Sequence, residues 1–303
     1  MLLSSVDIGS NAVRLLLANV YEKDGHSVAD KASLIRVPIR LGMDVFNSGR
    51  ISDERIGLLL KTMSAFGNLL DVYQPAAVKM CATAAMREAE NGKDIAKLIK
   101  EETNLNIKII DGLTEARIIS QYNSMLMLPE GDRSLFVDVG GGSTEISVLE
   151  NHKMLASGSF KIGTIRLLCD KIDNNEWNRL KSWLLSVKST RTGMICMGSG
   201  GNINKITKLF GSYKKDFISF KDLQKAYKQM DKLTIDERIT QLGLRPDRAD
   251  VIVPAAKIFL YIMDWAGIDK VIAPKLGLAD GLVLEMYNEI KKKVVAESST
   301  EYR

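Results

Sequence analysis

Three glycine-rich turns stand out because each follows an apolar stretch typical of a strand. They are Gly9-Ser10-Asn11, Gly140-Gly141-Gly142-Ser143 and Gly198-Ser199-Gly200-Gly201. Turns without Cβ atoms let backbone N–H groups approach a phosphate closely, and neighbouring hydroxyls add further donors. A single loop of this kind is usually only a tight turn. Three of them in one chain indicate a site that binds phosphate groups.

Acidic residues accompany the first two of these turns. Asp7 and Asp138 each stand at the end of an apolar strand, two residues before the first glycine, and they lie 131 residues apart. Glu145 follows on the returning strand of the second unit. Carboxylates in such places can hold Mg²⁺ against phosphate oxygens. One aspartate near a glycine is usually a turn residue, but the duplication favours Asp7, Asp138 and Glu145 as metal ligands.

The chain has few residues for catalysis or metal binding by histidine and cysteine. The chain has two histidines, His26 and His152, and three widely spaced cysteines, Cys81, Cys169 and Cys196. This set lacks the spacing of zinc sites and gives little material for a Ser-His-Asp triad. Any catalysis is therefore expected to depend on carboxylates, hydroxyls and backbone amides.

The charge and hydropathy of the chain limit its partners. A net charge of +5 mildly favours polyanionic ligands, while the run Lys291-Lys292-Lys293 is more typical of a solvated helix end than of a patch that binds a nucleic acid polymer. No apolar run approaches the ~18 residues needed to cross a bilayer. Residues Met1 to Asp7 lack the features of a secretory signal, so we expect a cytoplasmic protein without membrane contact.

The pattern of apolar residues predicts the elements that position these groups. Alternating segments over Leu2–Ile8 and Val13–Val20 predict a hairpin, with a third strand near Leu34–Ile39. Ser52 predicts the N-cap of an amphipathic helix, and a strand, helix, strand and helix follow up to residue 125. In the second half, a strand over 194–197 and helices over 177–187, 202–210, 220–230, 249–266 and 281–295 are predicted. The alternation is that of an α/β protein with parallel strands.

The repeated strand-Asp-Gly-strand unit also predicts the domain organisation. A chain of 303 residues is long enough for about two domains. The boundary belongs between the two units, near residue 126. We expect an N-terminal domain over 1–125 and a second over 126–282, with a C-terminal helix of about 283–303 packing back on the first.

Four motifs in order along the chain resemble those of the exopolyphosphatase/guanosine pentaphosphate phosphohydrolase family. They are Asp7-Ile8-Gly9-Ser10-Asn11, Asp111-Gly112-Leu113-Thr114-Glu115-Ala116-Arg117, the stretch from Asp138 to Glu145, and Gly198-Ser199-Gly200-Gly201. The stretches Ser157–Arg166 and Arg248–Gly281 are also similar to family segments. This resemblance implies the actin-like fold of sugar kinases, heat-shock ATPases and actin, in which two related ribonuclease-H-like domains enclose a phosphate site.

The resemblance also implies residue roles. Glu115 occupies the position of the family's catalytic glutamate, which would orient or deprotonate the attacking water. Arg87 matches a family arginine that would contact phosphate oxygens. Arg14, Arg40 and Arg166 are candidates either for the same contact or for ordinary ion pairs. A homodimer is implied by the resemblance alone.

Some positions depart from the family pattern. Thr114 stands where a second glutamate is common, Ala12 where a serine is common, and Ala279-Asp280 where an Arg-Glu pair is usual. Longer relatives carry a further C-terminal helical region, whereas this sequence ends at Arg303, so we expect short chains as substrates.

These observations together predict a Mg²⁺-dependent exopolyphosphatase that acts on terminal phosphoanhydride bonds. Hydrolysis of guanosine pentaphosphate is the alternative enzymatic reading. A cleft that senses polyphosphate or an alarmone without turnover is the alternative from another class, although a pure sensor needs no water-activating base. An ATP-using kinase or chaperone of the same superfamily would require an adenosine pocket that the sequence does not reveal.

Overall fold

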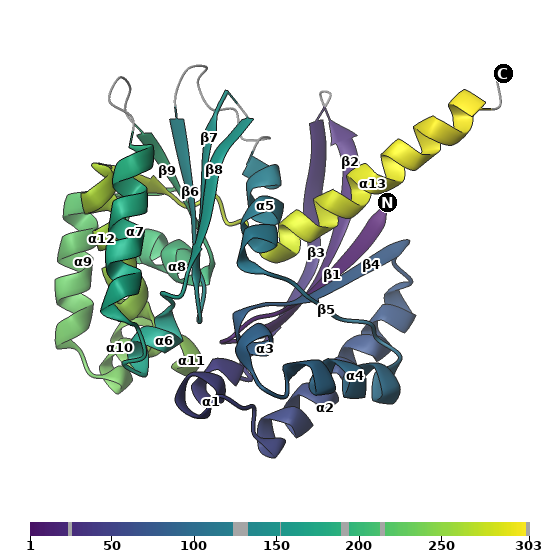
Figure 1. Cartoon of the computed structure of the whole chain (residues 1–303), viewed down its shortest axis with the longest axis horizontal. Helices are drawn as coiled ribbons and strands as arrows, with labels where there is room; N and C mark the ends of the chain where they lie inside the picture. The colour runs from purple at the N-terminus through teal and green to yellow at the C-terminus, as the bar shows by residue number, and fades with distance from the viewer. Residues whose placement is uncertain (24–25, 124–132, 152, 189–193, 213–215, 301–303) are drawn as a thin grey trace.

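The structure is a computed structural model that describes residues 1–23, 26–123, 133–151, 153–188, 194–212 and 216–300. Two β-sheets stand side by side, each with its own helices (Figure 1). We call the five-stranded sheet with its helices the first lobe and the six-stranded sheet with its helices the second lobe. The predicted boundary near residue 126 lies outside the described residues.

The first sheet has the strand order β3-β2-β1-β4-β5. Its strands are β1 (Leu2–Ile8), β2 (Val13–Lys23), β3 (His26–Val37), β4 (Ala77–Ala82) and β5 (Lys108–Ile109). β1 pairs antiparallel with β2 and parallel with β4. The turn between β1 and β2 closes with a hydrogen bond from Gly9 N to Ala12 O at 3.1 Å. The two strands of the predicted hairpin are therefore confirmed, and the third strand, predicted near Leu34–Ile39, begins earlier, at His26, and ends at Val37.

The second sheet repeats this arrangement within the order β10-β11-β9-β6-β7-β8. Its strands are β6 (Arg133–Val139), β7 (Thr144–Glu150), β8 (Lys153–Phe160), β9 (Met194–Ser199), β10 (Phe217–Ser219) and β11 (Lys270–Ile272). β6 pairs antiparallel with β7 and parallel with β9, as β1 does with β2 and β4. Gly140 N donates to Ser143 O at 2.9 Å, which closes the turn as in the first sheet. The repeat predicted from the sequence is thus a repeat of structure.

Most helices lie where the periodicity predicts them. Those of the first half are α1 (Leu41–Ser48), α2 (Asp53–Tyr73), α3 (Ala84–Glu88), α4 (Gly92–Thr103) and α5 (Gly112–Asn123). Those of the second half are α6 (Thr164–Leu168), α7 (Asn174–Val187), α8 (Gly201–Phe210), α9 (Phe220–Lys232), α10 (Ile235–Leu242), α11 (Pro246–Ala249), α12 (Ile252–Ala266) and α13 (Leu278–Thr300). The Ser52 hydroxyl accepts from Arg55 N, which confirms the predicted N-cap.

The sequence analysis did not predict several short helices, including α10, or the strands β8, β10 and β11. α3 and α6 each have five residues and α1 has eight, so none is long enough for a helical period to emerge. The helix predicted over 249–266 is two helices, α11 and α12. Pro254 stands in the first turn of α12, where its missing N–H costs no hydrogen bond within the helix.

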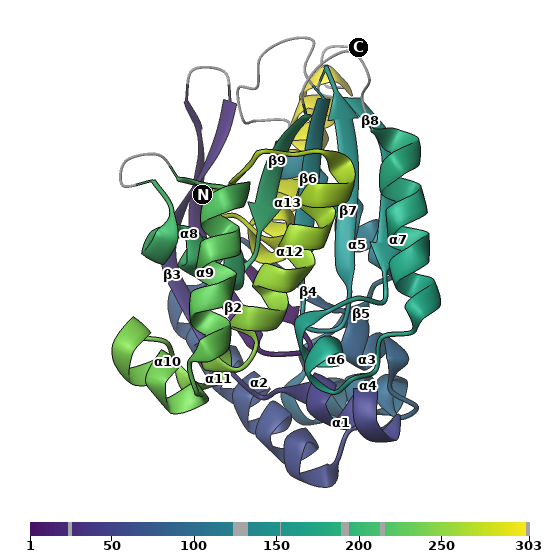
Figure 2. The same cartoon turned by 90° about the vertical axis from the view of Figure 1, so that its left-hand side faces the viewer.

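The helices cover the sheets unequally. α9 and α12 lie over the outer face of the second sheet (Figure 2). α5 and α13 lie between the two sheets, and α5 contacts β7 and β8 while α13 contacts β1 and β2 (Figure 1). α13 follows residues of the second lobe in sequence, so the end of the chain returns to the first sheet. Among the described residues, no helix combines the length and the apolar character that crossing a membrane requires.

Each lobe has its own hydrophobic core, but the two cores are joined at α6. The core of the first lobe includes two residues from the second half of the chain, Ile165 of α6 and Val251. Ile165 is fully buried, whereas Leu168 on the same helix is 41% exposed. Helix α6 therefore inserts a side chain of the second lobe into the core of the first.

We expect Ile165→Ala to lower the free energy of unfolding by about 2–5 kcal/mol, because it leaves a cavity where the two lobes meet. Urea denaturation followed by circular dichroism measures this change. Leu168→Ala on the same helix is the control and should change stability by less than about 0.5 kcal/mol. Equal effects of the two substitutions would show that α6 does not anchor the lobes.

Candidate active site

A cavity of about 210 Å³ opens between the two lobes. The first and second glycine turns meet in it: Gly9, Ser10 and Asn11 line one side, and the loop from Gly140 to Ser143 lines the other. Both turns end the central hairpin of their own sheet, and both hairpins point toward the same space. The duplicated units predicted from the sequence therefore face each other across a cleft.

Three carboxylates gather at this cleft. Asp138 on β6 and Glu145 on β7 are register partners across the hairpin. Glu115 comes from the first turn of α5, which packs against β7 and β8. One carboxylate oxygen from each residue lies within 4.8 Å of those of the other two. Two adjacent strands and a helix thus bring together acids that are separated in sequence.

Burial makes this group of acids electrostatically unusual. Glu115 and Glu145 are 7% and 2% exposed, and Asp138 is partly exposed. Burial, reinforced by the charges of Glu145 and Asp138, holds the pKa of Glu115 well above its usual range. Burial raises the pKa of Glu145 to about 7. It also raises the pKa of Asp138, although the nearby Ser199 hydroxyl and the charge of Arg14 oppose the shift.

The free oxygens of this cluster fit a divalent cation. Glu115 Oε2 and Glu145 Oε2 are buried without a hydrogen-bond partner among the described residues. Buried carboxylate oxygens without donors are costly, and a hard cation such as Mg²⁺ would supply the missing partner. Oxygen is also the ligand type that Mg²⁺ prefers. Glu115, Asp138 and Glu145 therefore make up an acidic cluster able to hold a metal ion.

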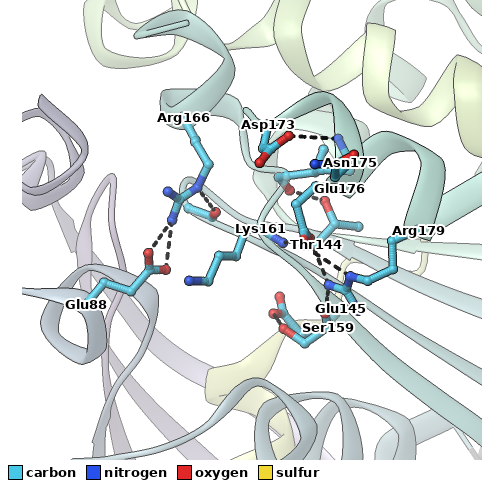
Figure 3. A network of polar contacts seen from close by, with 12 residues as sticks. Glu88, Thr144, Glu145, Ser159, Lys161, Arg166, Asp173, Asn175, Glu176 and Arg179 are labelled. Carbon is cyan, nitrogen blue, oxygen red and sulfur yellow. Dashed lines mark hydrogen bonds and ion pairs between the residues drawn. The ribbon is translucent and has the colours of Figure 1, made fainter. Parts of the chain in front are cut away.

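A layer of polar contacts fixes Glu145 from behind. The Ser159 hydroxyl donates to Glu145 Oε1 at 2.8 Å, and the Ser159 carbonyl accepts from Arg179 Nη2 at 2.7 Å. Arg179 is in turn paired with Glu176 at 2.8 Å (Figure 3). One oxygen of Glu145 is thus held while the other remains free toward the acidic cluster.

Asp7 and Arg87 lie near the cluster but are differently engaged. Asp7 lines the cavity, and its Oδ2 pairs with Arg14 Nη1 at 2.5 Å. Arg87 is not among the lining residues; its Nη1 donates to Ile110 O at 2.8 Å and lies 3.7 Å from Glu115 Oε2. Arg87 is therefore positioned to act on Glu115. Its charge opposes the upward shift of the Glu115 pKa.

The third glycine turn is divided between two tasks. Gly200 and Gly201 line the cavity at the start of α8. Gly198 and Ser199 do not line it: a Cβ at Gly198 would lie 2.8 Å from Val271, and the Ser199 hydroxyl donates to Leu276 O at 2.8 Å. The first half of this turn thus packs against the second lobe, and only the second half faces the cleft.

The cavity has a basic wall that the sequence did not single out. Lys31 and Arg36 reach it from the edge strand β3, Arg248 from α11, and Lys275 from the segment before α13. These four residues come from three separate stretches of the chain without any shared motif. Arg248 and Lys275 fall inside the segment Arg248–Gly281, which resembles the family. That resemblance is the one feature of the sequence that could have pointed to this wall.

Arg248 is the least compensated of these cations. Within the described part of the chain its guanidinium has neither an ion pair nor a hydrogen bond, whereas Arg36 pairs with Asp247. Burial, and then the charge of Arg36, lower the pKa of Arg248 to about 10. Its Nη2 would lie only 2.6 Å from a Cβ at Gly201, so the guanidinium rests on the glycine turn. Uncompensated positive charge beside open backbone amides favours an anion.

The remaining arginine candidates are ion-paired across the lobes. Arg40 Nη2 pairs with Asp250 at 2.5 Å. Arg166 Nη2 contacts both carboxylate oxygens of Glu88, at 2.7 and 2.8 Å, and neither arginine lines the cavity. Of the three arginines that the sequence offered as candidates, Arg14, Arg40 and Arg166, only Arg14 lines the cavity.

Known proteins resemble this chain over nearly its full length. A bifunctional 3-dehydroquinate synthase/phosphatase of Fusobacterium nucleatum is 28% identical over an alignment covering 93% of this chain but 46% of that relative, so the chain spans less than half of its length. Exopolyphosphatase 1 of Mycobacterium tuberculosis is 24% identical, with 99% of this chain and 92% of the relative covered.

A solved structure supports the same relationship. The crystal structure of the Aquifex aeolicus Ppx/GppA family member superposes with a TM-score of 0.76 at 26% identity, covering 95% of this chain and 98% of the other. This agreement confirms the predicted α/β fold. It is the fold of the family that the four sequence motifs resemble, and that resemblance implied an actin-like architecture. A sequence model described as the Ppx/GppA phosphatase family matches residues 20–290. The chain therefore belongs to the Ppx/GppA phosphatase family.

Proposed function

We propose that this chain is a Mg²⁺-dependent phosphohydrolase that releases the terminal phosphate of inorganic polyphosphate. The observation that carries the proposal is that acidic and basic side chains line the same cleft. Glu115 and Asp138 line it, Glu145 is buried next to them, and the uncompensated Arg248 lines it beside the third glycine turn. A phosphoanhydride chain has oxygens for the basic wall and a terminal phosphorus for the acidic end.

The residues present suggest a division of labour. Asp138 and Glu145 would hold Mg²⁺, which when bound would neutralise charge on the terminal phosphate. The backbone amides of the glycine turns, with Arg248, would hold the phosphates further along the chain. Asp7 keeps Arg14 oriented toward the cavity through their ion pair.

Glu115 is proposed to act on water. Its Oε2 is buried and accepts no hydrogen bond from the described residues, and its raised pKa makes it a stronger base than an ordinary carboxylate. The water oxygen attacks the terminal phosphorus, and the bond to the bridging oxygen breaks with its electron pair left on that oxygen. The released proton passes to Glu115. Arg87 beside it favours the ionised form before the step.

The substrate is identified by measuring phosphate release from polyphosphates of graded length and from guanosine pentaphosphate at equal concentration, with and without Mg²⁺. We expect Mg²⁺-dependent release that is faster with polyphosphate. Faster release from guanosine pentaphosphate would make that compound the substrate. Tight binding of either compound without phosphate release would overturn the hydrolase proposal and favour a sensor.

We expect Glu115→Gln to lower the rate of phosphate release by about 10²- to 10⁴-fold, because the amide cannot accept the proton of water. Steady-state kinetics measures the rate, and a thermal melt should show that the fold is retained. Glu101→Gln, at an exposed position on α4, is the matched control and should leave the rate unchanged. An unaltered rate in Glu115→Gln would remove Glu115 from the mechanism.

We expect Arg248→Ala to raise KM for polyphosphate by about 10-fold or more, the effect of losing a charge-assisted hydrogen bond to phosphate. The same initial-rate measurements give KM. Arg245→Ala removes an exposed arginine three residues earlier and should change KM much less. If both substitutions act equally, the effect is one of general charge and Arg248 holds no phosphate.

The raised pKa of Glu145 gives a pH dependence to the metal-free protein. Between its unfolded value near 4.5 and about 7, the folded state binds more protons than the unfolded state, so stability falls as pH rises through this window. The slope approaches about 1.4 kcal/mol per pH unit for each such proton. Urea unfolding in EDTA at pH 5 to 8 measures the slope, which Glu145→Gln should reduce. Added Mg²⁺ should restore stability at the higher pH values. A slope that is flat, or that rises with pH in both proteins, would contradict the shift.

A further inference from the structure

Arg166 of α6 contacts three separate parts of the molecule. Its Nε donates to Gly142 O at 2.8 Å. Its Nη2 donates to both carboxylate oxygens of Glu88 on α3, in the first lobe. Its guanidinium also lies over the ring of Phe46 on α1, 4.0 Å from the centroid. Figure 3 shows Arg166 reaching across to Glu88 from the second lobe.

These contacts hold the second glycine turn in a tight place. A Cβ at Gly142 would lie 2.5 Å from Phe46 Cζ and 2.8 Å from Ala84 Cβ, so only glycine fits between the lobes here. Arg166 fixes this residue by its carbonyl, and Phe46 meets both Gly142 and Arg166. A small shift of either lobe would therefore displace the loop from Gly140 to Ser143.

The other end of the contact is connected to the proposed base. Glu88 directly follows Arg87 on the five-residue helix α3. Arg87 lies 3.7 Å from Glu115 and donates to Ile110 O. Arg166 therefore joins the turn that follows Asp138 to the helix that carries the partner of Glu115.

We propose that Arg166 and Glu88 are positioning residues, which set the distance between Glu115 on α5, through its partner Arg87 in the first lobe, and the Asp138 hairpin in the second lobe. This inference rests on the proposed hydrolysis. Neither residue touches the cavity, so both act through Gly142 and Arg87. The pair keeps the two halves of the site in register for the attack of water.

A role in stability alone is a weaker explanation. A mostly buried ion pair between lobes recovers little more than the cost of desolvating its charges. Two further pairs, Arg36 with Asp247 and Arg40 with Asp250, also join the lobes, and Ile165 provides the apolar anchor. What distinguishes the Arg166–Glu88 pair is its bonding to the glycine turn and its adjacency to Arg87.

The test separates kcat from KM in Arg166→Lys and Glu88→Gln. Lysine keeps the charge but cannot bridge Gly142 O and both Glu88 oxygens at once. We expect kcat to fall by about 10²-fold, as for a misplacement of about 1 Å, with KM changed by less than about 2-fold. Glu88→Asp keeps the carboxylate and should lose less kcat than Glu88→Gln. The double variant should be no slower than the slower single variant, because the residues act as a unit.

Arg133→Lys is the matched control. Arg133 lies on β6, the strand that carries Asp138, but at the opposite end of that strand. It pairs with Glu150 on β7 at 2.8 Å, so both partners belong to one lobe. The substitution should leave kcat unchanged. Thermal melts show which variants fold. If Arg166→Lys does not fold, the kcat values of Glu88→Asp and Glu88→Gln test the positioning role.

The outcomes distinguish this inference from the proposed function. If the unaltered protein releases no phosphate, the hydrolase proposal falls and the positioning role with it. If the unaltered protein is active and the folded variants keep its kcat, the positioning role alone is overturned. A lower melting temperature with kcat unchanged would likewise assign the pair to stability only.

Discussion

The structure depends on keeping three carboxylates close together in a place that water barely reaches. Glu115, Asp138 and Glu145 repel one another, and burial raises that cost. The charge of Arg87, 3.7 Å from Glu115 Oε2, offsets only part of that cost. Two of the acids lie on the hairpin of β6 and β7 and the third on α5, and basic residues of β3 and α11 line the neighbouring cavity of about 210 Å³. A ligand with negative oxygens and a bound cation would satisfy both sets of charges at once.

Close packing between the lobes makes this arrangement definite. Gly142 has no room for a side chain, and Ile165 is buried in the core of the other lobe. The glycines of the second turn therefore serve two purposes: they expose amides to the cavity, and they let the lobes approach. This is why a turn that the sequence connects with phosphate also proves central to the contact between lobes.

The sequence was informative where one short segment carries the whole signal. The strand-Asp-Gly-strand repeat predicted two matching hairpins because strand alternation and turn residues are local properties, and Ser52 predicted a cap for the same reason. Glu115 was found through the resemblance alone, since its helix gives no sign of facing a cavity. Arg36, Arg248 and the Arg166–Glu88 pair remained hidden because their meaning comes from contacts between distant segments. Gly198 and Ser199 show the opposite limit, as a glycine-rich motif was read as one unit although packing divides it.

The path of the chain has a mechanical consequence. The polypeptide passes from the first lobe to the second after α5, and it returns by α13, which contacts β1 and β2. Two bodies joined by two covalent links have fewer ways to move than two bodies joined by one. The easiest remaining motion is a hinge rotation of one lobe about the line that joins the two links. Such a rotation would widen or narrow the cleft, and the contacts of Arg166 with Gly142 and Glu88 oppose it.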